Sequence, residues 1–141
     1  MEATPGPPSI LSSLDAFRHL RPLFSWTQEE VHIIALNVGR APIETKLLFR
    51  GTVDFCLFHP RDVFRFVIQH NASSFIIAHN HPSGDPTPSY QDIVITKKLH
   101  QAARLFQIEL IDHLILTEDR YLSLKELGLL SGKRRTEPNK F

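Results

Sequence analysis

The sequence has only one cysteine, Cys56, among its 141 residues. A lone cysteine forms no disulfide within the chain, and it excludes zinc sites and iron–sulfur clusters built from several thiolates. An excess of charge of either sign is also lacking, because 16 basic and 15 acidic residues leave a net charge of +1. No overall electrostatic signal therefore points to nucleic acid or to an anionic membrane.

Long apolar runs are missing as well, since none approaches the roughly 20 residues that a membrane span needs. The start of the chain lacks the basic and apolar segments of a signal peptide. These features predict a soluble, cytoplasmic protein with no membrane partner. The length suits one domain, and we expect a proline-rich disordered leader at 1–10, the domain at 11–131 and a flexible tail at 132–141.

Hydrophobic periodicity predicts alternating strands and helices. Strands are expected at 31–37, 44–50, 52–58, 73–79 and 108–117, and helices at 13–21, 60–71 and 89–107, followed by a short strand and a final helix within 121–130. An apolar stripe on the longest helix is expected to comprise Ile93, Thr96, Leu99, Ala103 and Phe106. The pattern predicts a single α/β domain with a mixed sheet flanked by helices.

Two histidines stand one residue apart where the strand at 73–79 ends. Side chains at i and i+2 of a strand point to the same face, so His79 and His81 can converge on one ion. In open α/β sheets, ligands gather at the carboxyl ends of strands, and this pair falls at such an end. The loop that follows is rich in proline and glycine, which suits a site that needs fixed geometry.

On the following helix, Ser89 and Asp92 share the face of the first turn. Asp92 can supply a carboxylate, and two histidines and an aspartate with a water form the open three-ligand site of a catalytic zinc. Ser-x-x-Asp before an apolar run is also a capping box, in which the serine accepts from the backbone and the acid reaches back. The pair alone favours the cap, whereas its spacing behind the two histidines favours a metal.

The stretch HNHPSGDPTPSYQD resembles the JAMM (MPN+) metallopeptidase motif, His-x-His-x(7)-Ser-x(2)-Asp. The segments FRGTVD, HPRDVF, NASSFIIAHNHPSGDPTPSYQDIVIT and IELIDHLIL resemble the RadC-type bacterial branch of that family, from about Glu30 to about Leu130. Two departures stand out. A helix-hairpin-helix module often precedes this domain in RadC-type chains, and we expect it to be missing here together with any DNA contact it brings. The family's Pro-Arg-Glu appears as Pro60-Arg61-Asp62, with the acid expected in the first turn of a helix.

The resemblance implies the MPN/JAB-like (cytidine-deaminase-like) fold, one zinc ion per chain, and hydrolysis of an amide bond in a peptide or protein substrate. It implies His79, His81 and Asp92 as zinc ligands and Ser89 as a donor to the tetrahedral oxyanion. In the family, a glutamate just ahead of the first core strand acts through the zinc-bound water as general base and then as acid. Glu30 precedes the strand at 31–37 and is our prediction for this residue.

Glu29 and Glu44 compete with Glu30 for the role of general base. Glu29 is adjacent, but successive strand residues face opposite ways, so only one of the two can point inward. Glu44 lies beyond the turn at 39–42, where the polar end of a strand explains it.

The remaining six histidines lie outside the motif. His19, His32, His59, His70 and His100 have no partner spacing, so surface or structural roles are expected. Asp112 and His113 resemble the family's Asp-His pair, and we expect His113 to pack beside the site, since three ligands and a water already complete it.

Three other functions compete with a zinc peptidase. A module associated with DNA repair would act on or near nucleic acid without peptidase activity, but the near-neutral charge and the lack of an aromatic-basic pattern argue against direct DNA binding. Some MPN domains are catalytically silent scaffolds, although those usually lose the ligands that this chain retains. A zinc deaminase would need a Pro-Cys-x-x-Cys element, which is absent here.

Overall fold

The computed structural model describes residues 6–51 and 59–130. Within these ranges the elements are α1 (Ser13–Leu20), the 3-10 turn η1 (Arg21–Leu23), β1 (Glu30–Leu36), β2 (Pro42–Arg50), α2 (Pro60–Gln69), β3 (Ser74–Asn80), α3 (Tyr90–Leu105), β4 (Glu109–Leu116) and β5 (Tyr121–Ser123). The strand expected at 52–58 lies outside the described residues. None of the described helices is long and apolar enough to cross a membrane.

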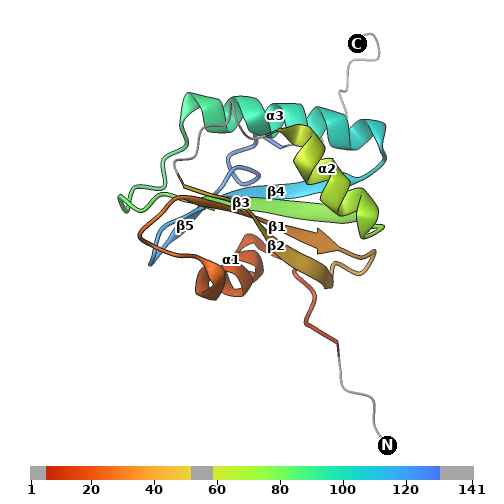
Figure 1. Cartoon of the computed structure of the whole chain (residues 1–141), viewed down its shortest axis with the longest axis horizontal. Helices are drawn as coiled ribbons and strands as arrows, with labels where there is room; N and C mark the ends of the chain where they lie inside the picture. Colours follow the sequence, from red (N-terminus) through yellow and green to blue (C-terminus); the bar gives the residue numbers. More distant parts are fainter. Residues whose placement is uncertain (1–5, 52–58, 131–141) are drawn as a thin grey trace, which may run out of the picture.

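The strands form one five-stranded mixed sheet in the order β2-β1-β3-β4-β5 (Figure 1). Only β3 and β4 are parallel, and α3 makes the crossover between them. Every residue of β1 and β3 is buried, because these central strands are covered on both faces. The predicted mixed sheet flanked by helices is confirmed.

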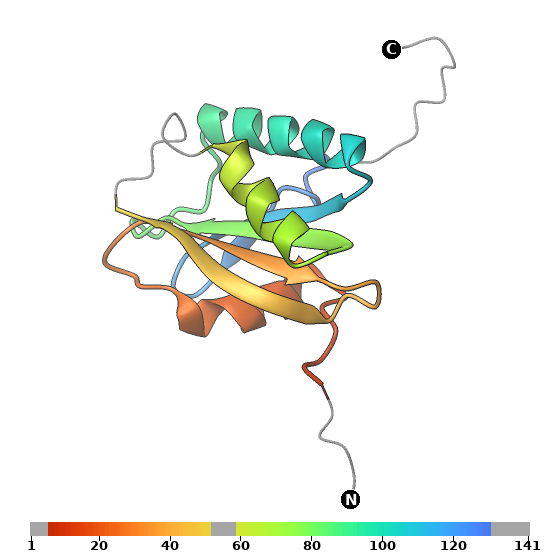
Figure 2. The same cartoon turned by 45° about the vertical axis from the view of Figure 1, so that its right-hand side comes forward.

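Two apolar cores lie on opposite faces of the sheet. On the α2/α3 face, alternate residues such as Val31, Ile33, Phe75 and Ile77 pack against those two helices. On the α1 face, the intervening residues of the same strands pack against α1 and the segment that follows it. Figure 2 shows the sheet between these helical layers. Each position on a central strand is therefore assigned to one of two different environments.

Two helical expectations differ from the structure. No helix forms at 124–130, where consecutive turns include Gly128 with a φ of +81°, a conformation that ends helical winding. In α3 the buried positions include Ile95, Thr96, Leu99 and Ala103, whereas Phe106 is the C-terminal cap and is 54% exposed. The predicted stripe is thus wrong at both ends: Ile93 is only half-buried while Ile95 is buried, and the helix ends at Leu105, before Phe106.

Candidate metal centre

The two histidines of the motif project from the carboxyl end of β3. His79 pairs with Val31 of β1 and Ile115 of β4, so it is held on both sides by the sheet. His81 stands just past the strand, where its backbone N–H donates to Leu116 O at 2.8 Å and its Nδ1 lies 2.9 Å from Asp85 O. The main chain of His79 is thus fixed by both neighbouring strands, and the imidazole of His81 is held by Asp85 O.

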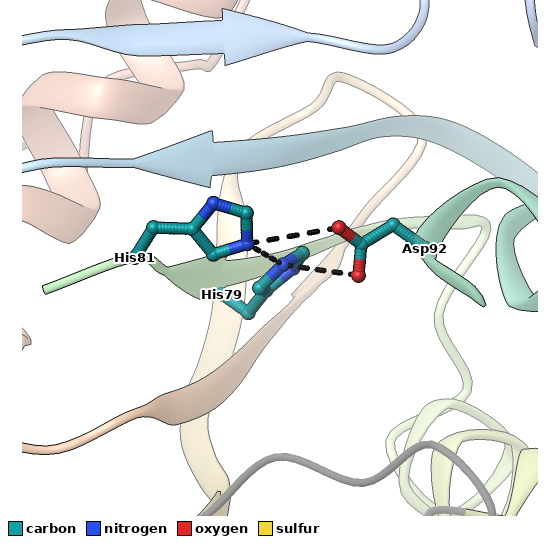
Figure 3. Close-up of side chains that lie close together, drawn as sticks. All are labelled: His79, His81 and Asp92. Carbon is teal, nitrogen blue, oxygen red and sulfur yellow. Dashed lines mark hydrogen bonds and ion pairs between the residues drawn. The ribbon is translucent and has the colours of Figure 1, made fainter. Parts of the chain in front are cut away.

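Asp92 reaches the same point from the first turn of α3 (Figure 3). The Nε2 atoms of His79 and His81 are 3.0 Å apart. Asp92 Oδ1 lies 3.3 Å from His79 Nε2, and Asp92 Oδ2 lies 3.6 Å from His81 Nε2. The three residues that sequence spacing singled out as ligands are therefore brought together.

The spacing of these atoms fits a small tetrahedral cation. Ligand atoms about 2.1 Å from a tetrahedral ion lie about 3.4 Å from one another, which is close to the 3.0 Å between the two Nε2 atoms and to the 3.3 Å from His79 Nε2 to Asp92 Oδ1. His79 and Asp92 are each 2% exposed, whereas the side chain of His81 is 20% exposed. An ion held by this group, the His79–His81–Asp92 triad, would face solvent on the His81 side.

The capping box forms at Asp92, and it is compatible with a metal-binding role for the same carboxylate. Ser89 Oγ accepts from Asp92 N at 3.1 Å, and Asp92 Oδ2 accepts from Ser89 N at 2.8 Å, which completes a capping box. The same carboxylate presents both oxygens to the histidines. The cap fixes the rotamer of Asp92, and in that rotamer the carboxylate faces His79 and His81.

The pKa values of Asp92 and His81 are shifted by the contacts within the triad. Burial works to raise the pKa of Asp92, but the close approach of the His79 and His81 imidazoles outweighs it and holds that pKa well below its usual range. The ion pair with Asp92 in turn raises the pKa of His81, and the negative charge of Glu29 acts in the same direction. The aspartate is an anion in this setting and is ready to bind a cation.

His113 lies directly behind His79. Its Nε2 is 2.8 Å from His79 Nδ1, and its Nδ1 contacts Thr96 Oγ1 of α3. Burial holds the pKa of His113 well below its ordinary value. Asp112 makes a different set of contacts. Its carboxylate accepts hydrogen bonds from Ser123 Oγ and from the backbone N–H groups of His113 and Lys125, and so it anchors the start of the turns at 124–130.

Glu30 is not brought to the triad. It lies on the α1 face, where its carboxylate accepts hydrogen bonds from Ser25 N at 2.9 Å and Arg50 Nε at 2.7 Å and lies 3.0 Å from His32 Nε2. The side chain is completely buried. The prediction of Glu30 as general base does not fit this geometry, because side-chain alternation along β1 directs it away from His79.

Alternation along the chain leading into β1 assigns Glu29 to the opposite face of the sheet. It precedes Val31 by two residues, and Val31 belongs to the α2/α3 face and pairs with His79. The ladder extends to it, since Glu29 O accepts from Gly51 N at 2.9 Å. Its side chain is half-buried and its charge reaches His81. Glu44 is exposed and pairs with Ala35, four residues along β1 from Val31 and so about 13 Å from that end of the strand.

Two polar residues around the triad were missed by sequence reasoning. Asn80, between the two histidines, uses its amide on the α1 face to bond Glu30 N, Ser25 O and Gln28 O. Thr96 was assigned to an apolar stripe. A buried threonine one helical turn beyond Asp92 is the signal that could have identified it, because a buried hydroxyl requires a hydrogen-bond acceptor.

This fold and this site define a JAB-type domain, and a family model described as the RadC-like JAB domain matches residues 10–129. The chain belongs to the RadC-like JAB domain family. It is similar to UPF0758 protein STH371 of Symbiobacterium thermophilum, with 46% identity over 104 residues, which are 74% of this chain and 44% of the relative. A UPF0758 protein of Clostridium perfringens is 44% identical over 117 residues, or 83% of this chain and 49% of the relative.

UPF0758 protein YsxA of Bacillus subtilis is 43% identical over 104 residues, which cover 74% of this chain and 45% of that protein. The chain thus spans about half the length of the curated relatives it matches.

Proposed function

We propose that this domain is a zinc-dependent hydrolase that cleaves an amide bond in a peptide or protein, with His79, His81 and Asp92 as the metal ligands. The observation that carries the proposal is the convergence of two imidazole Nε2 atoms and one carboxylate within 4.8 Å. Two nitrogens and an oxygen with one side open are a donor set typical of catalytic zinc. Bound zinc would lower the pKa of a water and polarise a carbonyl.

Glu29 is the residue that we assign as general base. It lies on the same face of the sheet as His79, and its charge influences His81. From there its carboxylate would take the proton of the attacking water and later deliver it to the leaving nitrogen. We do not assign this role to Glu30, because its carboxylate contacts Ser25, His32 and Arg50 on the opposite face.

Ser89 is our candidate for stabilising the oxyanion. Its Oγ already accepts from Asp92 N, so the hydroxyl proton can be donated elsewhere. It is exposed at the open end of α3, next to the triad. A donor to the developing oxyanion often contributes a few kcal/mol to catalysis.

A matched pair of variants tests this assignment. Glu29→Gln and Glu30→Gln each remove one negative charge from adjacent residues, so their total charge is equal. We expect Glu29→Gln to lower kcat on a peptide or isopeptide substrate by at least about 100-fold while zinc stoichiometry stays at one. Glu30→Gln should retain activity within about tenfold but unfold at lower denaturant concentration.

Metal analysis of His79→Ala and Asp92→Ala provides the second arm of the test, with zinc content expected to fall from about one per chain to near zero. Zinc-free wild-type protein after purification in zinc-containing buffer would contradict the metal centre itself. Equal activity of Glu29→Gln and wild type would contradict the base alone. Tight, salt-sensitive DNA binding without peptidase activity would favour a module acting on nucleic acid.

A further inference from the structure

A continuous chain of side-chain hydrogen bonds runs from the first turn of α3 to His79. Thr96 Oγ1 lies 2.6 Å from Asp92 O and 2.5 Å from His113 Nδ1. His113 Nε2 then lies 2.8 Å from His79 Nδ1. All four residues are buried, with 2% or less of each exposed. No water can therefore replace one of these bonds without a rearrangement of the core.

The direction of every bond in this chain follows from its first member. A carbonyl oxygen only accepts, so the single hydroxyl proton of Thr96 is donated to Asp92 O. Thr96 Oγ1 must then accept from His113, which places a proton on His113 Nδ1. His113 is a buried imidazole whose two nitrogens are engaged by Thr96 and His79, so it is neutral and its Nε2 is an acceptor. That acceptor requires a proton on His79 Nδ1.

We infer that Thr96 and His113 are positioning residues that fix the proton of His79 on Nδ1 and so reserve Nε2 for the metal. The inference rests on the proposed role of His79 as a ligand, and it adds a reason why this atom faces Asp92 and His81. It also links the ligands to one another, because the carbonyl at the head of the chain belongs to Asp92. Removing the partner that orients a histidine ligand in this way commonly weakens metal binding by about 10–100-fold.

Thr96→Val is the direct test, since valine keeps the shape of threonine and removes the hydroxyl. We expect Thr96→Val to weaken zinc binding by about 10–100-fold in a competition titration. Thr96→Ser retains the hydroxyl and should bind within about threefold of wild type. Thr45→Val is the matched control, because Thr45 Oγ1 also bonds a histidine, His19 Nε2 at 2.8 Å, but in β2 and away from the triad. It should leave zinc affinity unchanged.

The tautomer is read independently of zinc from ¹⁵N chemical shifts of His79 in metal-free protein above neutral pH. Wild type and Thr96→Ser should show the Nδ1–H form, whereas Thr96→Val should shift His79 toward the Nε2–H form. A wild-type His79 that carries its proton on Nε2 would overturn the inference even if Thr96→Val fails to fold. Unchanged zinc affinity in folded Thr96→Val would overturn it too. Absence of zinc binding in wild type with the Nδ1–H form intact would instead count against the proposed function.

Discussion

At the scale of single residues, we assign different roles to two adjacent glutamates because a strand alternates its faces. Glu29 belongs to the side of the sheet that carries His79, and Glu30 belongs to the side that carries α1. The buried carboxylate of Glu30 accepts hydrogen bonds from Ser25 and Arg50 and contacts His32. One residue of register therefore separates a candidate catalytic group from a structural one.

The structural role of Glu30 predicts a dependence of stability on pH. Burial tends to raise the pKa of Glu30, but the bonds from His32, Ser25 and Arg50 together lower it. A lowered pKa in the folded state means that Glu30 stabilises the fold fully above the ordinary glutamate pKa of about 4.3, and that this contribution is lost as the pH falls through the folded value. Wild type should exceed Glu30→Gln by about 2 kcal/mol in the free energy of unfolding near neutral pH.

Urea unfolding of metal-free protein at a series of pH values measures this difference. The gap between wild type and Glu30→Gln should narrow steadily below about pH 4.3, because a protonated glutamate resembles glutamine. Glu44→Gln, at an exposed site in β2, should differ from wild type by less than about 0.5 kcal/mol throughout. A gap that stays constant down to acid pH would show that the charge of Glu30 is not what stabilises the fold.

The convergence of His79, His81 and Asp92 could be predicted from sequence, whereas the face of the sheet on which each glutamate lies could not. His79, His81 and Asp92 are fixed by local spacing on one strand and one helix turn, and local spacing is visible in the sequence. The choice between Glu29 and Glu30 depends on which face of β1 looks toward α3, and every residue of β1 is buried. With both faces buried, hydrophobic alternation gives no sign of direction. The contact of Thr96 with His113 could not be predicted either, because it depends on the long-range pairing of β4 with β3.

At the scale of elements, the end of β3 serves two faces of the sheet at once. His79 points to the α2/α3 face, and Asn80 points to the α1 face, where it bonds Glu30 N, Ser25 O and Gln28 O. These bonds fasten the segment 25–30, which carries Glu29, to the strand that carries the ligands. The sequence His-Asn-His thus joins the two parts of the candidate site.

Asn80→Ala should loosen the segment that carries Glu29 while it leaves the metal ligands in place. Three polar groups lose their partner, so we expect a loss of about 3 kcal/mol in the free energy of unfolding. Faster hydrogen exchange should be confined to amides in 25–30, and kcat should fall more than zinc affinity. Asn37→Ala is a suitable control, because Asn37 also accepts from a backbone N–H, that of Ala41, but at the other end of β1.

Asn80→Asp separates the contributions of this side chain. Aspartate keeps an acceptor for Glu30 N and loses both donors to the carbonyls of Ser25 and Gln28. An intermediate loss of stability is expected. If Asn80→Ala weakened zinc binding as much as it lowered kcat, then Asn80 would act on the ligands and not on the segment of Glu29.

At the scale of the whole molecule, the triad ties β3 to α3 across the α2/α3 core. His79 is held by β1 and β4, and Asp92 is held by the helix that crosses over the sheet. Closure of the triad by an ion would add metal–ligand bonds to the apolar packing and the Asp92–His79 contact that join α3 to β3 and to the Thr96–His113 contact that joins α3 to β4. Metal binding and global stability should therefore be coupled.

Zinc should raise the melting temperature of this domain, and the rise should depend on the presence of the three ligands. At a free zinc concentration about 100-fold above the dissociation constant, the folded state gains about 2.7 kcal/mol, which corresponds to roughly 5–10 °C for a domain of this size. Differential scanning calorimetry with zinc and then with excess chelator measures the shift and its reversal. Asp92→Ala should show little or no shift, and an equal shift in that variant would mean that zinc binds elsewhere.

The stabilisation by zinc should also shrink as the pH falls below neutral. Asp92 raises the pKa of His81, so protonation of His81 begins above the ordinary histidine value of about 6.5, and a protonated imidazole cannot bind zinc.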